Sequence, residues 1–467
     1  MGLEAGRSKR AFAGGPRVDD MHAGIPSDLS ANSRHGGRRL DEHHRCRDVA
    51  KEHDMVGSIG IATRREFLAT GLGVVGIGCG LPQFLVRSAL AGPNEPAGGS
   101  VLVVLQLGGG NDGLSSVVPL RNDDYRRLRR STRIDERDAL KVSDEAGLHP
   151  NLTGFRDLLD ARSLAIVRSV GYPNPNLSHF HSMDIWHTAD PKGRRAGAGW
   201  LGRAVDSLGG EEPNPALSVA IGSGAAPLAV EGERHRGLCF QQPEGFRFNG
   251  GRGERIRESA YRALQQNGGE LAENDALQYV TRTSVAANAS SERVRELASK
   301  HLGKSEYPAT PLGKSLETVG ALIAGGLETR IYYVVHGGFD THAGQRGRHD
   351  RLMQQMSEAV VAFQRDLTAQ GNVDRVLTMA FSEFGRRAQE NGSGGTDHGT
   401  AGPMFLIGPC VKPGLHGPAP NLADLDKGNL KFSIDFRQVY AAILERHLAM
   451  QARPVLGGDY AAFDCLA

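Results

Sequence analysis

The sequence of 467 residues has few cysteines and almost no net charge. Five cysteines are too few for a scaffold held together by disulfides. The 55 Lys and Arg residues balance 53 Asp and Glu residues, which argues against a dedicated nucleic-acid binder. The mean hydropathy is −0.35, and no apolar run reaches the roughly 20 residues that cross a bilayer. A protein built from several membrane spans is therefore excluded.

Several cofactor motifs are also missing. The glycines at 108–110 are not followed by the Gly-Lys-Ser/Thr of a P-loop and do not complete G-x-G-x-x-G, so nucleotide binding has little support. No haem, flavin or iron–sulfur motif supports a redox enzyme. Glycine itself is abundant: it makes up 62 of the 467 residues, about 13%, whereas its average share in proteins is about 7%. Because these glycines cluster beside Asp, Asn and His, they predict tight loops lined by backbone groups.

The first 91 residues are not expected to belong to the folded protein. Residues 1–54 show no apolar period, which predicts a disordered or untranslated leader. Residues 55–91 have the order of a secretory signal: Arg-Arg-Glu-Phe-Leu at 64–68, a glycine-rich apolar run at 69–79, and the small-x-small sequence at 89–91. The paired arginines resemble a twin-arginine signal. We therefore expect export by the twin-arginine machinery to a bacterial periplasm or cell surface, with no membrane span after signal removal.

Continuous apolar runs in the remaining chain indicate strands buried on both faces. Such runs occupy residues 101–107, 164–167, 217–221, 330–335, 376–381 and 404–407. Between two of them, apolar residues from Leu352 to Leu367 recur at three- and four-residue spacing, which is typical of an amphipathic helix. Strand, helix and strand in this order imply a parallel sheet. We predict an α/β domain over 92–467 with a mainly parallel sheet, and an inserted helical cap at about 230–310.

Acidic, imidazole and guanidinium groups collect beside the predicted strand ends, where open α/β sheets bind ligands. They are Asp112, Asp340, His342, His349, Glu383, Arg386, Arg387, Asp397 and His398. Asp112 alone could be a helix cap, and Asp397-His398 a turn. In combination, carboxylates and imidazoles at several strand ends predict a divalent metal or anion site. Arg386 and Arg387 could bind an anionic substrate or lie on a solvated face.

A nucleophile candidate, Ser178, lies in the loop sequence Asn-Leu-Ser-His-Phe-His before a helical stretch. The amino end of a helix carries a positive field that suits an oxyanion or a phosphate. His179 beside it is a candidate for substrate binding. The alternative is that Ser178 is only an N-cap residue, and Ser115 and Ser116 are weaker candidates for the same role.

Five motifs of the mature chain resemble those of one bacterial family. They read Leu-Gly-Gly-Gly-Asn-Asp-Gly-Leu, Pro-Asn-Leu-Ser-His-Phe, Gly-Gly-Phe-Asp-Thr-His, Phe-Ser-Glu-Phe-Gly-Arg-Arg and Gly-Gly-Thr-Asp-His-Gly-Thr-Ala, in that order, from about Val101 onward. The chain resembles the family catalogued as domain of unknown function 1501. That family is similar to the alkaline phosphatase and sulfatase superfamily. The resemblance implies a doubly wound sheet with helices on both faces.

The resemblance also implies roles for individual residues. It implies metal ligands at Asp112, Asp340, His342, Asp397, His398 and His416, with Ser178 as the nucleophile. The spacing of Asp340 and His342 is shorter than usual in the superfamily, and His349 is an alternative partner for Asp340. Glu383 stands at the strand end where the Asp-His pair usually lies. Either Glu383 replaces Asp397 as a ligand, or the loop folds back to deliver Asp397 and His398.

The function implied by this resemblance is that of an exported metal-dependent hydrolase of phosphate or sulfate esters. It would hold one or two divalent ions, with Zn, Mn, Ca or Fe as candidates, and act on a small anionic ester. The alternative is a non-catalytic exported protein of the same fold that binds a ligand or has a structural role.

Overall fold

The computed structural model describes residues 99–192, 197–210, 214–222, 225–246 and 290–467. The predicted leader and signal, and most of the predicted cap, lie outside these ranges, although residues 290–301 of the cap are helical. In the described ranges, no helix is both long enough and apolar enough to span a membrane.

In the described residues, nine strands form the main sheet, in the order β11-β5-β10-β9-β1-β8-β6-β7, with β12 also paired to β5. The strands are β1 (Val101–Gly108), β5 (Leu164–Gly171), β6 (Ser218–Ile221), β7 (Leu238–Phe240), β8 (Ile331–Gly337), β9 (Val376–Phe381), β10 (Gly402–Ile407), β11 (Gly414–His416) and β12 (Ile434–Asp435). Only β10 runs antiparallel to its neighbours β5 and β9. The predicted α/β class and mainly parallel sheet are confirmed, and each predicted apolar run overlaps a strand.

Strand β1 lies between β8 and β9 and is parallel to both. Its apolar run is continuous because its two faces pack against different cores. Val103 and Leu105 belong to one core, whereas Leu102 and Val104 belong to the other. A strand covered on both sides has no polar face, which explains the uninterrupted pattern in the sequence.

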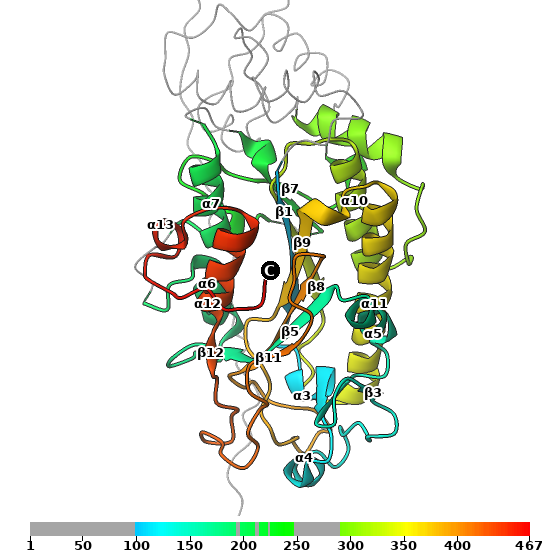
Figure 1. Cartoon of the computed structure of the whole chain (residues 1–467), viewed down its shortest axis with the longest axis vertical. Coiled ribbons are helices and arrows are strands. Elements are labelled where there is room, and N and C mark those ends of the chain that lie inside the picture. Colours follow the sequence, from blue (N-terminus) through cyan, green and yellow to red (C-terminus); the bar gives the residue numbers. More distant parts are fainter. Residues whose placement is uncertain (1–98, 193–196, 211–213, 223–224, 247–289) are drawn as a thin grey trace, which may run out of the picture. The chain divides into compact units, whose positions relative to one another are not determined.

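Helices cover both faces of the sheet, as predicted (Figure 1). One face carries α5 (Thr153–Asp160), α10 (Pro311–Ala324) and α11 (Gln345–Ala369). The other carries α6 (His179–Thr188), α7 (Trp200–Leu208), α12 (Phe436–Ala442), the π-helical turn Ile443–His447 and α13 (Ala452–Leu456). The long α11 includes the predicted amphipathic stretch and buries its apolar positions against the sheet.

Smaller elements follow β1 and lie at the end of the sheet drawn lowest in Figure 1. They are α3 (Gly113–Ser116), α4 (Asp123–Leu128) and an antiparallel sheet of β2 (Val117–Pro119), β4 (Ala146–Leu148) and β3 (Leu140–Lys141). Single 3-10 turns occupy Pro215–Leu217, Leu228–Val230, Pro243–Gly245 and Val373–Arg375. The parallel strands β1, β5, β8 and β9 end at one edge of the sheet, and the antiparallel β10 begins there. The loops that carry the candidate residues therefore meet at this edge.

A buried ion pair fixes the loop after β1. Both nitrogens at the end of Arg129 contact the Asp112 carboxylate, at 2.5 and 3.0 Å, and both side chains are fully buried. Arg129 also donates hydrogen bonds to the carbonyl oxygens of Arg387 and Ala388, at 2.9 and 2.6 Å. The Gln345 amide at the start of α11 donates to the same carboxylate. The pair thus ties the β1 loop to the β9 loop and to α11.

Replacing Asp112 with Ala should lower the free energy of unfolding by about 3–5 kcal/mol at pH 7, because it leaves the charge of Arg129 buried without an anionic partner. Urea unfolding measures this change. Replacing the exposed Asp123 with Ala is the matched control and should have little effect. A loss below about 1 kcal/mol for the Asp112 variant would show that the pair is not needed for stability.

The stabilisation from Asp112 should depend on pH. Burial by itself raises the pKa of Asp112, but the charge of Arg129 and the hydrogen bonds from Arg129 and Ser115 together hold the pKa well below its usual range. The pair therefore stabilises the folded protein above about pH 4, the usual pKa of aspartate in an unfolded chain, and loses this contribution as the pH falls. The difference between wild type and Asp112→Ala should shrink in unfolding curves recorded at decreasing pH.

Candidate metal centre

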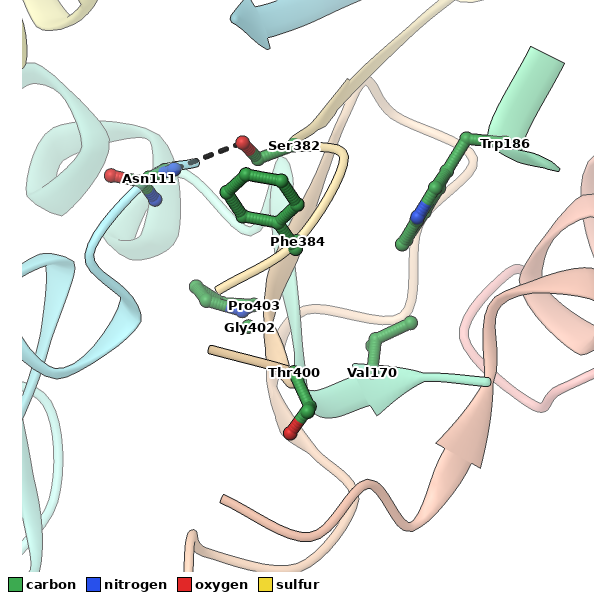
Figure 2. Close-up of a pocket in the computed structure, with 8 residues that line it drawn as sticks. All are labelled: Asn111, Val170, Trp186, Ser382, Phe384, Thr400, Gly402 and Pro403. Atoms are coloured by element: carbon green, nitrogen blue, oxygen red, sulfur yellow. Dashed lines mark hydrogen bonds between the residues drawn. The ribbon is translucent and has the colours of Figure 1, made fainter. Parts of the chain in front are cut away.

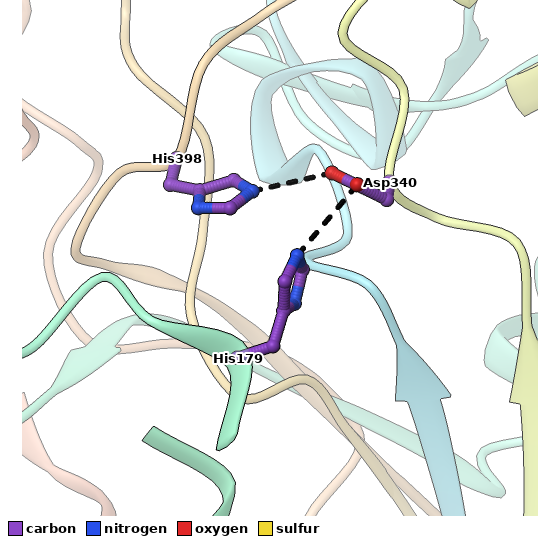
Figure 3. Close-up of side chains that lie close together, drawn as sticks. All are labelled: His179, Asp340 and His398. Carbon is purple, nitrogen blue, oxygen red and sulfur yellow. Dashed lines mark hydrogen bonds and ion pairs between the residues drawn. The ribbon is translucent and has the colours of Figure 1, made fainter. Parts of the chain in front are cut away.

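Three side chains from distant parts of the chain converge at the carboxyl edge of the sheet. His179 begins α6, Asp340 follows β8 and His398 precedes β10. One ligand atom from each lies within 4.8 Å of the others. Figure 3 shows both imidazoles facing the carboxylate, with His398 Nε2 at 3.2 Å from Asp340 Oδ1 and His179 Nε2 at 3.7 Å from Asp340 Oδ2. This is the arrangement expected of ligands around a single cation.

A third imidazole adjoins this group. His342 Nε2 lies 3.1 Å from Asp340 Oδ1 and 3.0 Å from His398 Nε2. His342 comes from the same loop as Asp340, so the short spacing seen in the sequence still brings both residues to one place. The cluster of these four residues, His179, Asp340, His342 and His398, is called the metal centre below.

Each imidazole of the metal centre has an oxygen atom within 3.3 Å of its Nδ1, the ring nitrogen that does not face the other members of the centre. His398 Nδ1 lies 2.8 Å from the carbonyl oxygen of Leu177, which can only accept, so Nδ1 carries the proton and Nε2 keeps its lone pair. His179 Nδ1 lies 2.9 Å from Glu383 Oε1, and the same logic applies. Histidines that bind metals are held in this way by carboxylates or carbonyl groups.

His342 follows the same pattern, with Nδ1 at 3.3 Å from Asp397 Oδ1. With all three Nδ1 atoms donating outward, the Nε2 atoms and the Asp340 carboxylate present only acceptors to one another. Acceptors as close as 3.0 Å repel one another unless a cation or protons lie between them. Three imidazole nitrogens and one carboxylate oxygen form a donor set that suits Zn²⁺, and also Fe or Mn. The residues present therefore fit a divalent metal.

The buried Arg386 holds the loops of the metal centre together. Its guanidinium donates hydrogen bonds to the carbonyl oxygens of Gly109, Gly110, Phe339 and Thr396. It also donates to Asp340 Oδ1 at 2.9 Å. Burial alone would raise the pKa of Asp340, but hydrogen bonds from Arg386 and His398 lower it to about 2, so the carboxylate is ionised. Because its guanidinium is fully buried, we assign Arg386 to the architecture of the site rather than to substrate.

A glycine permits the close approach of two of these loops. Gly109 has a φ of +117°, which side chains rarely allow, and a Cβ there would lie 2.4 Å from the backbone nitrogen of Asp340. The glycine-rich loop after β1 thus lets the loop that carries Asp340 pack directly on its backbone.

Other predicted ligands lie outside the group of converging side chains. Asp112 is engaged by Arg129, as described above. Glu383 is buried and accepts from the Gly109 backbone N–H at 2.8 Å as well as from His179. His416, in β11, lies with Nε2 at 2.6 Å from the carbonyl oxygen of Lys412. A direct ligand role for these three residues stays a prediction and is not part of the proposal below.

Two further candidates, Asp397 and His349, lie outside the metal centre. Asp397 contacts His342 and accepts from the Asn391 amide at 3.0 Å, so the loop does fold back to bring both Asp397 and His398 to this edge. His349 is buried with Nε2 at 3.0 Å from Asn111 Oδ1, and burial lowers its pKa to about 3. It therefore stays neutral inside the protein.

The three candidate nucleophiles differ in exposure. Ser178 is exposed at the N-cap position of α6, and its side chain makes no capping hydrogen bond. Ser115 is buried and donates to Asp112 at 2.8 Å, and Ser116 is buried and donates to Asn111 Oδ1 at 3.0 Å. Ser178 is thus the candidate whose hydroxyl group is free to react.

The Phe384 ring contacts the metal centre and also lines a small cavity. The Phe384 ring packs against His179 and His398, with centroid distances of 5.0 and 4.4 Å. Its far side lines a cavity of about 10 Å³, shown in Figure 2, which also borders Asn111 and Trp186. That volume holds about one water molecule, so no substrate enters from this side.

The place of His179 among the converging side chains was not predicted from the sequence, which assigned this residue to substrate binding. The informative signal is its position at the start of the helix after β5. Because β5 is parallel to β9, its carboxyl end meets the same edge of the sheet as the other site loops.

The family model described as a protein of unknown function, DUF1501, matches residues 162–449. The chain belongs to the DUF1501 family. This confirms the family that the motifs indicated. No curated protein matches the chain significantly.

Solved structures similar to this DUF1501 chain include a synthase, a sulfatase and a protein of the alkaline phosphatase superfamily. The lipoteichoic acid synthase LtaP from Listeria monocytogenes is 10% identical, covers 74% of this chain and 72% of its own, and has a TM-score of 0.31. The sulfatase PsFucS1 from Pseudoalteromonas sp. is 11% identical, with coverages of 73% and 68% and a TM-score of 0.32. A protein of the alkaline phosphatase superfamily from Vibrio parahaemolyticus is 8% identical, with coverages of 80% and 76% and a TM-score of 0.33.

Replacing Glu383 with Gln should weaken zinc binding by about 10–100-fold, because the carboxylate that orients His179 loses its charge. Competition with a chelator of known affinity measures this change. The matched control is Glu358→Gln on the exposed side of α11, which should bind zinc like the wild type. Equal zinc affinity in the Glu383 variant would remove Glu383 from the support of the metal centre.

Proposed function

We propose that this protein is an exported, metal-dependent hydrolase of phosphate or sulfate esters. The observation that carries the proposal is the convergence of three imidazole Nε2 atoms on the Asp340 carboxylate. His179, Asp340 and His398 would bind the metal, with His342 as the fourth ligand. When bound, the metal supplies a Lewis acid that polarises the ester and stabilises negative charge.

Ser178 is the proposed nucleophile. Its hydroxyl group is exposed, precedes the ligand His179 directly and lies at the amino end of α6, where the helix dipole favours negative charge. The Ser178 oxygen would form a bond to phosphorus or sulfur while the bond from that atom to the ester oxygen breaks, and the proton given up by Ser178 would end on the leaving oxygen to form the free alcohol. Water would then hydrolyse the serine ester and release the inorganic anion.

The second candidate function is binding without catalysis. The observation that favours it is the engagement of Asp112 by Arg129, because the superfamily resemblance gives that position to a metal ligand. A chain that keeps a single metal centre has lost one of the two ions of a two-metal hydrolase. Metal content and ester hydrolysis, measured on the same variants, separate the two functions.

The wild type should hold about one divalent ion per chain, and Asp340→Ala should lose it while staying folded, with a lower free energy of unfolding because Arg386 loses its carboxylate partner. Ser178→Ala should keep the metal and lose hydrolysis of aryl phosphates or sulfates, with kcat lower on the order of 10³-fold or more. Elemental analysis and product release measure the two effects. The control is Ser207→Ala, an exposed serine of α7.

Metal-free protein of normal stability, insensitive to Asp340→Ala, would contradict the hydrolase and favour binding without catalysis. Bound metal with a fully active Ser178→Ala variant would contradict only the nucleophile.

Export is part of the same proposal and rests on residues 55–91. Changing both Arg64 and Arg65 to Lys should retain the precursor in the cytoplasm of a bacterial host, because the twin-arginine route reads this pair. Cell fractionation measures the distribution, with Arg47→Lys in the leader as the control. Export of the double variant at the wild-type level would exclude the twin-arginine route.

A further inference from the structure

An open depression of about 310 Å³ borders the metal centre. It is lined by Leu177, His342, Arg387, Asp397, His398 and Asn429. Two of these residues belong to the metal centre, so a group in the depression lies directly beside the proposed metal. The volume is at the lower end of the range for small-molecule sites, about 300–1,000 Å³.

The depression is lined by hydrogen-bond donors and by hydrogen-bond acceptors. Arg387 is half-buried and donates through Nη2 to the carbonyl oxygen of Lys427, and its other N–H groups have no partner among the described residues. Asp397 has a half-exposed carboxylate, of which only Oδ1 accepts hydrogen bonds from the described part of the chain. Asn429 Oδ1 is buried and has no donor in that part. A ligand here meets donors and acceptors together.

Neighbouring hydroxyl groups match this combination, because each hydroxyl both donates and accepts. Sulfate offers only acceptors, so it would leave Asn429 Oδ1 unpaired, and any inorganic anion would be repelled by the charge of Asp397. An aryl or alkyl group would give no hydrogen bond to the remaining N–H groups of Arg387, to Asp397 Oδ2 or to Asn429 Oδ1. The side chain of Leu177 and the imidazole faces supply apolar contact for the C–H groups of a ring.

We propose that the depression binds the alcohol part of the ester and that this alcohol is a sugar or another polyol. The inference rests on the proposed function and deepens it, because it names the substrate as a sugar or polyol phosphate or sulfate. Arg387 and Asn429 then determine specificity, whereas the metal centre and Ser178 act on the ester bond.

The first experiment measures binding without catalysis. Saturation-transfer NMR on the zinc-loaded full-length protein compares methyl glucoside with cyclohexylmethanol, a ring of similar size with a single hydroxyl group. The wild type should bind the glucoside and not the cyclohexyl probe. Arg387→Met and Asn429→Leu should each weaken glucoside binding about tenfold, as expected for the loss of a buried hydrogen bond. The control is Lys431→Met. Lys431 lies two positions after Asn429, is exposed and pairs with Asp424.

The second experiment measures hydrolysis of hexose 6-phosphate and 6-sulfate against phenyl phosphate and sulfate. The wild type should have the higher kcat/KM for the hexose esters, and Arg387→Met and Asn429→Leu should lower that preference about tenfold. Lys431→Met should preserve it. Melting temperatures and zinc contents equal to wild type establish that the variants are folded.

The two experiments separate the inference from the proposed function. Variant-dependent glucoside binding without hydrolysis of any ester overturns the hydrolase and upholds the sugar site. Hydrolysis of phenyl and hexose esters with equal kcat/KM, unchanged in both variants, overturns the sugar site and upholds the hydrolase. Absence of glucoside binding to folded, zinc-loaded wild type also overturns the sugar site.

Discussion

The site depends on the guanidinium of Arg386, which is buried where the loops after β1, β8 and β9 meet. A buried cation is costly unless it is fully hydrogen-bonded, and here backbone carbonyl oxygens from three loops and one carboxylate satisfy it. Because these carbonyl groups point inward to one guanidinium, the loops cannot move independently. Arg386 also binds Asp340 directly, so the residue that fixes the loops also fixes the carboxylate on which the histidines converge.

Two carboxylates at this edge of the sheet, Asp112 and Asp340, have different roles because their hydrogen-bond partners differ. Asp112 faces Arg129 in the interior, where the ion pair uses both oxygens. Asp340 gives one oxygen to Arg386 and keeps a half-exposed side chain among three imidazoles. The first carboxylate therefore stabilises the fold, and the second remains open to a cation. A negative charge beside three imidazole nitrogens is the donor set through which we propose that the exposed end of the site binds a metal.

Strands such as β1 and β9 could be predicted because burial on both faces imposes an apolar run that is visible in the sequence. The predicted parallel sheet implied that the loops meet at one edge. This implication brought Asp340, His342 and His398 together, as the structure also shows. The partner of Asp112 could not be predicted, because Arg129 stands in a run of arginines that reads as a solvated surface. Glu383 and His179 are likewise joined by a contact between residues 204 positions apart, which no local pattern reveals.

The central claim is that three imidazoles and one carboxylate bind a single metal ion. X-ray absorption spectroscopy on the zinc-loaded protein tests it most directly, because it counts and identifies the atoms around the ion. We expect about four ligands at about 2.0–2.2 Å, including the multiple-scattering signature of three imidazoles, and no sulfur. His398→Ala should remove one imidazole from the spectrum. A shell of oxygen atoms alone, or a spectrum unchanged by His398→Ala, would contradict the account.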